Sequence, residues 1–203
     1  MNRSRQLGVG LALLSYPALA FAHSPYPGIR GFYVGALHPL TEPAHFLVIL
    51  AISLLLGTQV NEARFNCLKT LFFSTAIGLI LAFAIAVLLP TAILILLLLA
   101  SLGLLLVLPR RLPDWAYRVL TGASGFLLAM ESIPEPGPVL DVMITSFGSL
   151  IGIHYLIMYC SRGVSLLMKK WQSRVSEISV RVLGSWFTAI AGLMLAFTVA
   201  GLI

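Results

Sequence analysis

The sequence predicts an all-α membrane protein, a polytopic bundle of about six transmembrane helices that follows a cleaved signal peptide. The prediction rests on three observations, namely the composition, the lengths of the apolar stretches and the placement of basic residues. Of 203 residues, 59% are hydrophobic and only 10% are charged, and the mean hydropathy is +1.00. Such a chain has too little polar surface to cover a water-soluble globule. The formal charge of +6 does not indicate a nucleic-acid partner, because the basic residues lie in short clusters between apolar stretches.

Residues 1–22 have the pattern of a secretory signal peptide. Two arginines precede a short apolar core, and Ala-Phe-Ala at 20–22 is the small-x-small pattern that signal peptidase accepts. The core is too short to span about 30 Å of hydrocarbon comfortably, which disfavours the alternative of an uncleaved first helix. We expect cleavage before His23, which leaves residues 23–203 as a single membrane domain.

The remaining chain contains apolar stretches that are long enough to cross a bilayer at a rise of about 1.5 Å per residue. Proline and charged residues are concentrated between them. The second and third stretches are separated only by Pro90 and Thr91, yet together they are about twice as long as one span needs, so a tight reversal is expected at Pro90. The predicted spans are 33–56, 68–89, 91–108, 116–133, 139–160 and 182–203.

The basic residues between the spans give an independent test of this topology. If the mature N-terminus faces the periplasm, only Arg30 lies outside, and the other basic residues lie in cytoplasmic loops and helix ends. This distribution obeys the positive-inside rule, and one helix more or fewer would scatter the charges over both sides. We expect a multi-pass protein of a bacterial inner membrane with both mature termini in the periplasm. The cytoplasmic residues are Arg64, Lys69, Arg110, Arg111, Arg118, Arg162, Lys169, Lys170, Arg174 and Arg181.

Polar side chains at the start of the first span have the chemistry of a metal site. If this segment is helical, His38, Glu42 and His45 lie within about 60° of one another on a helical wheel. Imidazole and carboxylate are ligands of first-row transition metals. Pro43 lacks a backbone N–H, so it would kink the helix or start it one turn later, which frees backbone carbonyls near the membrane surface. The alternative is a pair of interfacial imidazoles that bind nothing.

Three further residues are candidates for the same cation. After cleavage, His23 would offer both its α-amino group and its imidazole, which together can chelate a metal. Glu131 closes the fourth span and would either face the same outer vestibule or remain a plain interfacial carboxylate. His154 would lie about 22 Å below the periplasmic surface, too deep to share a site with His38. It is either a second station on a translocation route or a structural hydrogen-bonding group.

Residues 23–47 contain the short motifs HSP at 23–25, GFY at 31–33, HP at 38–39 and PAHFL at 43–47. This set resembles the start of HupE/UreJ family proteins, which are small bacterial membrane proteins with a signal peptide, a histidine-rich first helix and about six spans. The family is regarded as nickel or cobalt permeases. The resemblance implies that Ni²⁺ or Co²⁺ is the transported ion, with copper or zinc as alternatives.

The first-helix motif of that family has the form HPxxGxDH, and this chain departs from it. His38, Pro39 and His45 match the two histidines and the proline of the motif. Glu42 stands at its glycine position and Ala44 at its aspartate position. A carboxylate is thus retained two places earlier. A second family motif, FHAxAH, has only His154 as a loose counterpart, so the resemblance implies a divergent member of the family.

The sequence is compatible with three functions. The first is a permease that captures a divalent transition metal at its periplasmic mouth and passes it inward. The second is a non-transporting accessory subunit for metalloenzyme metallation or assembly. The third is a rhomboid-like intramembrane protease, because residues 122–125 have the GxSG form around Ser124, but His154 would differ from Ser124 in depth by about 9 Å.

Among these functions we expect transport rather than catalysis. The sequence has no nucleotide-binding motif, so no organic cofactor is expected. The expected partners are the lipid bilayer, the metal ion, and either a second copy of the chain or a metalloenzyme maturation partner, with no nucleic acid.

Overall fold

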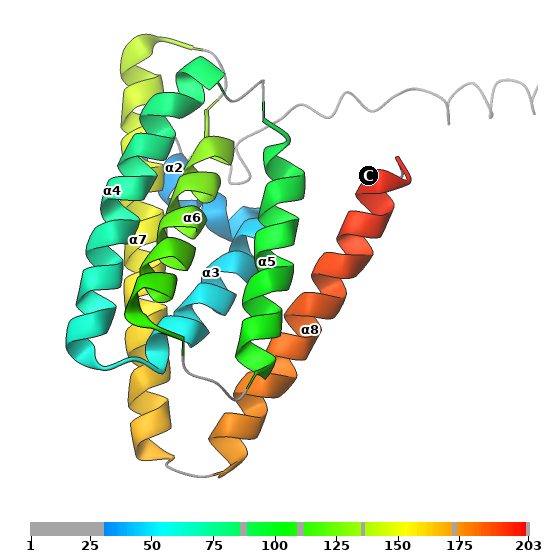
Figure 1. Cartoon of the computed structure of the whole chain (residues 1–203). Coiled ribbons are helices and arrows are strands. Elements are labelled where there is room, and N and C mark those ends of the chain that lie inside the picture. Colours follow the sequence, from blue (N-terminus) through cyan, green and yellow to red (C-terminus); the bar gives the residue numbers. More distant parts are fainter. Residues whose placement is uncertain (1–30, 86–88, 109–111, 135–136, 172–173, 202–203) are drawn as a thin grey trace, which may run out of the picture.

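A computed structural model describes residues 31–85, 89–108, 112–134, 137–171 and 174–201 of the chain. In these residues it contains seven α-helices and no β-strand (Figure 1). The predicted signal peptide and His23 lie outside the described residues. The helices are α2 (Phe32–Thr41), α3 (Pro43–Gly57), α4 (Asn61–Ile85), α5 (Thr91–Val107), α6 (Asp114–Glu131), α7 (Val139–Lys170) and α8 (Arg174–Val199).

The central helix of the bundle is α3, which contacts each of the other six described helices. Around it, α4 packs against α6, α5 packs against α8, and α2 packs against α7 (Figure 1). Its apolar side chains Val48, Ile49, Ile52 and Leu56 are fully buried or nearly so and form the middle of the main hydrophobic cluster. Any group carried on the inward faces of α3 is therefore shielded from both lipid and water.

The first predicted span is one apolar segment broken into α2 and α3. The two helices meet at an angle of 81°. Glu42 between them has extended backbone angles, φ −94° and ψ 114°, because the ring of Pro43 excludes the helical conformation from the residue before it. The hydroxyl of Thr41 donates to the carbonyl of His38 at 2.8 Å and satisfies one carbonyl at the end of α2. The break follows from local sequence, as the position of Pro43 predicted.

Three described helices, α4, α7 and α8, are long and apolar enough to cross a membrane, and the bent pair of α2 and α3 would be a fourth span. The helix α5 is apolar throughout but has 17 residues. The helix α6 has 18 residues, among them Asp114, Arg118 and Glu131. The architecture therefore supports a helical membrane protein, and the count of six spans stays a prediction.

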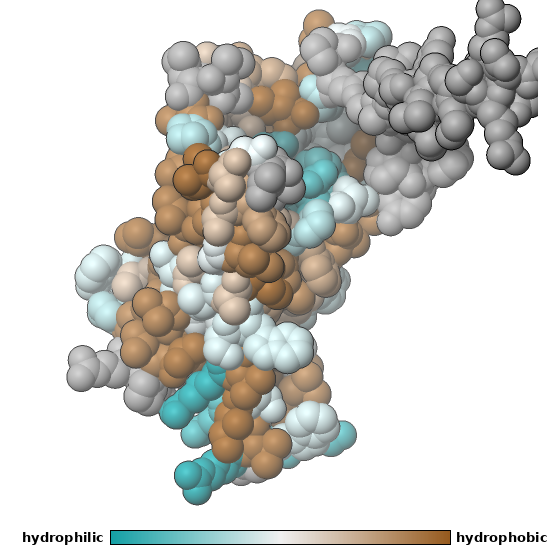
Figure 2. All heavy atoms as spheres, turned by 90° about the vertical axis from the view of Figure 1, so that its right-hand side faces the viewer, coloured by the Kyte–Doolittle hydropathy of each residue, from teal (hydrophilic) through white to brown (hydrophobic). Residues whose placement is uncertain are grey.

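The outer surface of the bundle is largely apolar. Exposed side chains include Phe73 and Ile80 on α4 and Trp186 and Leu193 on α8. Figure 2 shows hydrophobic residues over much of one face, with hydrophilic residues at the end where α7 and α8 meet and a second hydrophilic group nearer the opposite end. A surface of this extent requires an apolar solvent such as the bilayer interior.

The two halves of the broken segment are held in place partly by a close approach of α2 to α7. A Cβ atom added at Gly148 would overlap the carbonyl oxygen of Phe32, and one added at Gly152 would overlap that of Ala36. Only glycine at these positions lets the two backbones touch. This contact fixes the position of α2 along α7 and therefore the level of the bundle at which His38 lies.

Candidate functional site

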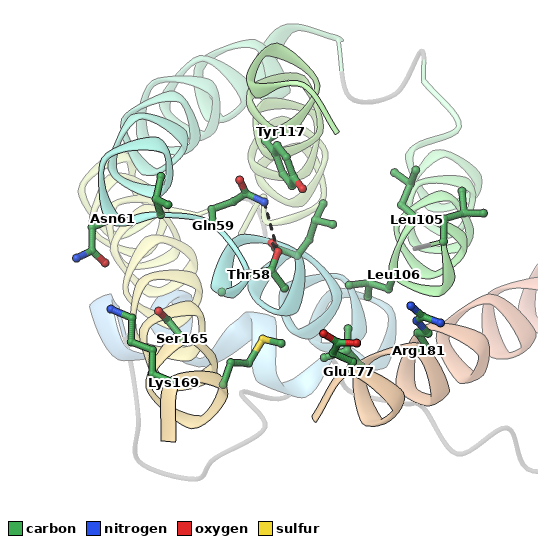
Figure 3. Close-up of a pocket in the computed structure, with 16 residues that line it drawn as sticks. Thr58, Gln59, Asn61, Leu105, Leu106, Tyr117, Ser165, Lys169, Glu177 and Arg181 are labelled. Carbon is green, nitrogen blue, oxygen red and sulfur yellow. Dashed lines mark hydrogen bonds between the residues drawn. The ribbon is translucent and has the colours of Figure 1, made fainter. Parts of the chain in front are cut away.

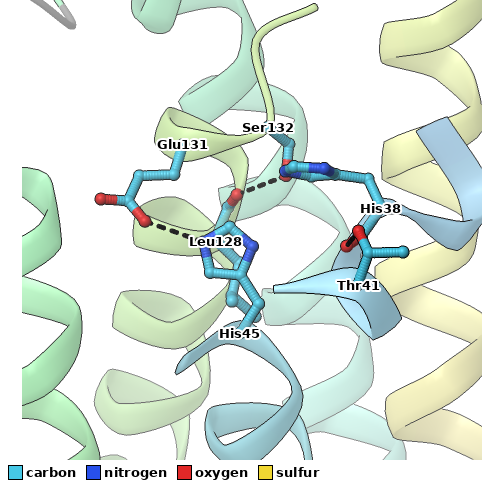
Figure 4. A network of polar contacts seen from close by, with 6 residues as sticks. All are labelled: His38, Thr41, His45, Leu128, Glu131 and Ser132. Atoms are coloured by element: carbon cyan, nitrogen blue, oxygen red, sulfur yellow. Dashed lines mark hydrogen bonds and ion pairs between the residues drawn. The ribbon is translucent and has the colours of Figure 1, made fainter. Parts of the chain in front are cut away.

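His45 and Glu131 are the centre of a polar cluster at the end of the bundle where α6 ends and α7 begins, here termed the α6–α7 end (Figure 4). Nε2 of His45 lies 2.8 Å from Oε2 of Glu131. An ionised carboxylate only accepts hydrogen bonds, so Nε2 carries the proton and donates it. The side chain of His45, in the first turn of α3, is 3% exposed, and that of Glu131, the last residue of α6, is 23% exposed.

The imidazole of His38 lies against that of His45 across the break between the two helices. The ring centroids are 5.4 Å apart and the ring planes are inclined by 77°. In Figure 4, Glu131 approaches His45 from one side and His38 lies on the other. The two helices that carry these histidines meet at the bend of 81°, so the rings approach each other across the break that Pro43 predicted and not along one continuous helix.

Two nitrogen atoms of this imidazole pair, Nε2 of His38 and Nδ1 of His45, are buried and have no hydrogen-bond partner among the described residues. A buried polar atom left unpaired costs about 1–3 kcal/mol of folding free energy, so a functional role or a bound ion or water is expected at such an atom. With the Nε2 proton of His45 committed to Glu131, Nδ1 of the neutral ring carries a lone pair. The cluster therefore presents unpartnered imidazole nitrogens on two adjacent rings, which is the chemistry that a transition metal accepts.

Glu131, for which the sequence left open a carboxylate of the outer vestibule or a plain interfacial one, is the hydrogen-bond partner of His45. A histidine that binds a metal through one nitrogen commonly donates from the other to a carboxylate, which fixes the tautomer and the ring orientation. The bond from His45 to Glu131 has that form. Among the described residues, no three His, Cys, Asp or Glu side chains lie together in a way that could hold an ion. The arrangement thus consists of two imidazoles and one carboxylate that orients the second of them.

Glu42 is not part of this cluster. It caps the N-terminus of α3 in the extended conformation and its side chain is exposed. The helical-wheel argument placed it beside the histidines, but the chain is not helical at this residue, so the shared face does not exist. The hydroxyl of Ser132 donates to the carbonyl of Leu128 at 2.6 Å and so satisfies one carbonyl at the end of α6 (Figure 4).

His154 and Ser124, the two residues of the protease alternative, are not brought together. The ring of His154 packs edge-on against Phe72, with centroids 5.7 Å apart, and its Nδ1 is buried without a partner. The hydroxyl of Ser124 donates to the carbonyl of Leu120 at 2.8 Å within its own helix. Ser124 therefore has the ordinary role of a buried serine in an apolar helix.

A cavity of about 700 Å³ opens at the opposite end, where α7 ends and α8 begins, here termed the α7–α8 end (Figure 3). Its wall combines Tyr117 and Ser165 with the charged side chains of Lys169, Glu177 and Arg181. From the sequence, the basic residues set the topology and suggested a loop that contacts anionic headgroups, but they did not predict this cavity. The available signal was that α7 and α8 continue as helices past the apolar spans, so that their charged turns face each other.

This chain was compared with known proteins and protein families. Neither the curated proteins nor the solved structures gave a match. The profile of one protein family, described as HupE / UreJ protein, matches residues 11–195, which is most of the chain and includes every residue of the polar cluster. The resemblance seen in residues 23–47 is therefore confirmed, and this chain belongs to the HupE/UreJ family.

Proposed function

We propose that this protein is an inner-membrane permease that takes up a divalent transition metal between His38 and His45. The family is associated with nickel or cobalt transport and with accessory roles in metal handling. The observation that carries the proposal is the pair of buried, unpartnered nitrogens on two imidazoles whose centroids are 5.4 Å apart. Ni²⁺ and Co²⁺ are the favoured ions, and copper or zinc are alternatives.

The ligand set suits an ion that must leave again. Two imidazoles leave several coordination positions open to water or to a further ligand, whereas a closed site of four protein ligands holds a structural metal. A transported ion has to bind strongly enough to enter and weakly enough to move on. His23, outside the described residues, would add its imidazole and α-amino group once the signal peptide is removed, and Glu42 would attract cations at the entrance.

The proposed route runs along α3 from the imidazole pair to the cavity at the α7–α8 end. His45 and Gly57, which lines that cavity, are 12 positions apart, or about 18 Å at the rise of an α-helix. Between them the interior is filled by Val48, Ile49 and Ile52. Passage therefore needs the helices around α3 to move, as alternating access requires.

The proposed topology has six passes with both mature termini in the periplasm. It places the imidazole pair on the periplasmic side and the basic cavity on the cytoplasmic side. A membrane potential of 100 mV, negative inside, contributes about 2.3 kcal/mol per elementary charge and roughly twice that for a divalent cation. Potential alone could therefore drive uptake.

Metal influx into proteoliposomes that contain a metal-sensitive dye tests this proposal. We expect Ni²⁺ or Co²⁺ influx with the wild type and strongly reduced influx with His38→Ala and His45→Ala. Asp141→Asn is the matched control, because Asp141 is an exposed carboxylate at the same end of the bundle. Metal binding without influx would favour the accessory function, and influx that is equal in all four proteins would refute the site.

A further inference from the structure

Two arginines, one on α4 and one on α7, line the same cavity near the α7–α8 end of the bundle. Among the described residues that line this cavity, none is acidic. Arg64 lies in the first turn of α4 and is 6% exposed, and Arg162 is an exposed residue of α7. Both share one acceptor, because Oδ1 of Asn61 lies 2.6 Å from Nη2 of Arg64 and 3.5 Å from Nη1 of Arg162. Nη1 of Arg64 is buried and has no hydrogen-bond partner.

This arrangement leaves a buried positive charge without compensation. A guanidinium removed from water is unfavourable unless a counter-charge and hydrogen bonds replace its hydration. Across the described part of the chain, neither guanidinium has an acidic group within ion-pair distance. The nearby carboxylates of Glu62 and Asp114 line a separate pocket together with Arg118.

The space between the two arginines is a cavity of about 350 Å³ whose remaining wall is apolar and aromatic, formed by Phe65, Leu68, Met158 and Tyr159. Phe65 is 59% exposed and Tyr159 is 63% exposed, so the cavity opens on the outer surface of the bundle, which faces lipid in a membrane. The ammonium of Lys69 lies 4.5 Å from the centroid of the Phe65 ring and adds a third positive charge beside the opening.

We propose that this cavity binds a phosphate-bearing anion, and that the phosphodiester of an anionic phospholipid is its natural source. The planar guanidinium matches two phosphate oxygens at once, and the unpaired Nη1 of Arg64 supplies the missing donor. The aromatic wall would hold the first part of an acyl chain along α4 and α7. Basic pockets between helices near the cytoplasmic surface recognise anionic headgroups in this way. The bound lipid would fasten the start of α4 to α7.

Thermal unfolding of the full-length protein, purified in a zwitterionic detergent, tests this assignment. We expect phosphatidylglycerol to raise the Tm of the wild type and phosphatidylcholine to leave it unchanged. In Arg162→Gln, half-maximal stabilisation should need about fivefold more phosphatidylglycerol. Arg118→Gln removes an equal charge from an exposed position at the same end of the bundle and should behave as the wild type.

Arg64→Gln should lose the response altogether, and if that variant does not fold, the exposed Arg162 still provides the test. Inorganic phosphate forms the second arm of the experiment. Stabilisation by inorganic phosphate alone, lost in Arg162→Gln, would assign the cavity to a free anion instead of a lipid. An equal response of Arg162→Gln, Arg118→Gln and the wild type to every additive would overturn the assignment.

Discussion

Nε2 of His45 and Oε2 of Glu131 lie 2.8 Å apart although 86 positions separate them in the chain. The bond joins the start of the central helix α3 to the last residue of α6. It also decides which nitrogen of His45 remains available, because the donor is committed to the carboxylate and Nδ1 is left with its lone pair. If the imidazole pair binds a metal as proposed, Glu131 would act on that metal through the imidazole that it orients.

Replacement of the carboxylate of Glu131 by an amide should weaken metal binding without removing a ligand. In Glu131→Gln the acceptor remains but its charge is lost, so the imidazole of His45 becomes a weaker and less well oriented donor to the metal. Loss of such a partner typically lowers affinity about 10- to 100-fold. Calorimetric titration of Ni²⁺ into the purified protein measures the change, and Asp141→Asn serves as the control. Unchanged affinity in Glu131→Gln would show that the bond is only structural.

The two histidines should matter much more than Glu42. His38→Ala and His45→Ala each remove one of two proposed ligands, so uptake at a low metal concentration should fall at least about tenfold. Glu42→Gln changes only the field at the entrance, because the side chain is exposed, and should lower uptake less than about threefold. Metal uptake by cells that express each variant to the same level gives the comparison. A larger loss of metal uptake in Glu42→Gln than in His45→Ala would contradict the proposal that His45 is a ligand and that Glu42 only attracts cations.

His45 and Glu131 should also be coupled in stability. A double-mutant cycle with His45→Ala and Glu131→Ala should give a coupling free energy of about 0.5–3 kcal/mol, the range for residues in direct contact. The measurement is reversible unfolding in mixed micelles at one pH. Additive effects of the two substitutions would mean that the 2.8 Å contact does not persist in solution.

The glycines between α2 and α7 should tolerate no side chain. Gly148→Ala introduces a methyl group that overlaps the carbonyl of Phe32, and such overpacking costs about 1–3 kcal/mol. Gly192 is the matched control, because a Cβ atom there meets nothing within 4 Å. Gly192→Ala should leave the Tm unchanged or raise it slightly, since alanine favours a helix more than glycine does. Equal Tm values for both variants would argue against the close contact.

Ser124→Ala separates transport from proteolysis. The hydroxyl bonds only the carbonyl of Leu120, so its removal should cost less than about 1 kcal/mol and leave metal uptake as in the wild type. Cleavage of a model transmembrane substrate should be absent from both proteins. Serine-dependent cleavage would instead restore the protease alternative.

Much of the fold was predictable because the bilayer imposes long apolar helices and excludes other structures. The described helices overlap the six predicted spans. The break before α3 follows from the ring of Pro43, which excludes the helical conformation at Glu42, and α5 begins directly after Pro90. The limits of α7 and α8 were less predictable. Their charged turns continue past the apolar segments, so that α7 ends at Lys170 and α8 begins at Arg174. Hydropathy carries no signal there, but helix propensity and packing still act.

The site was predictable in its residue types and less so in its geometry. His38 and His45 stood out because two imidazoles flank Pro39 and Pro43 near the start of the first predicted span. The choice of carboxylate could not be made from sequence, because Glu42 is close in the chain whereas Glu131 is close only after α3 and α6 pack together. A wheel drawn through Glu42 assumes a helix that Pro43 interrupts, and the bend of 81° decides which groups meet.

X-ray absorption at the nickel edge of the loaded, purified protein shows whether the imidazoles of His38 and His45 hold one ion jointly, as proposed. We expect about one Ni²⁺ per chain with scattering from two imidazoles, reduced to one imidazole and weaker binding in His38→Ala and in His45→Ala. The same spectrum and the same metal content in the wild type and both variants would rule out a shared ion.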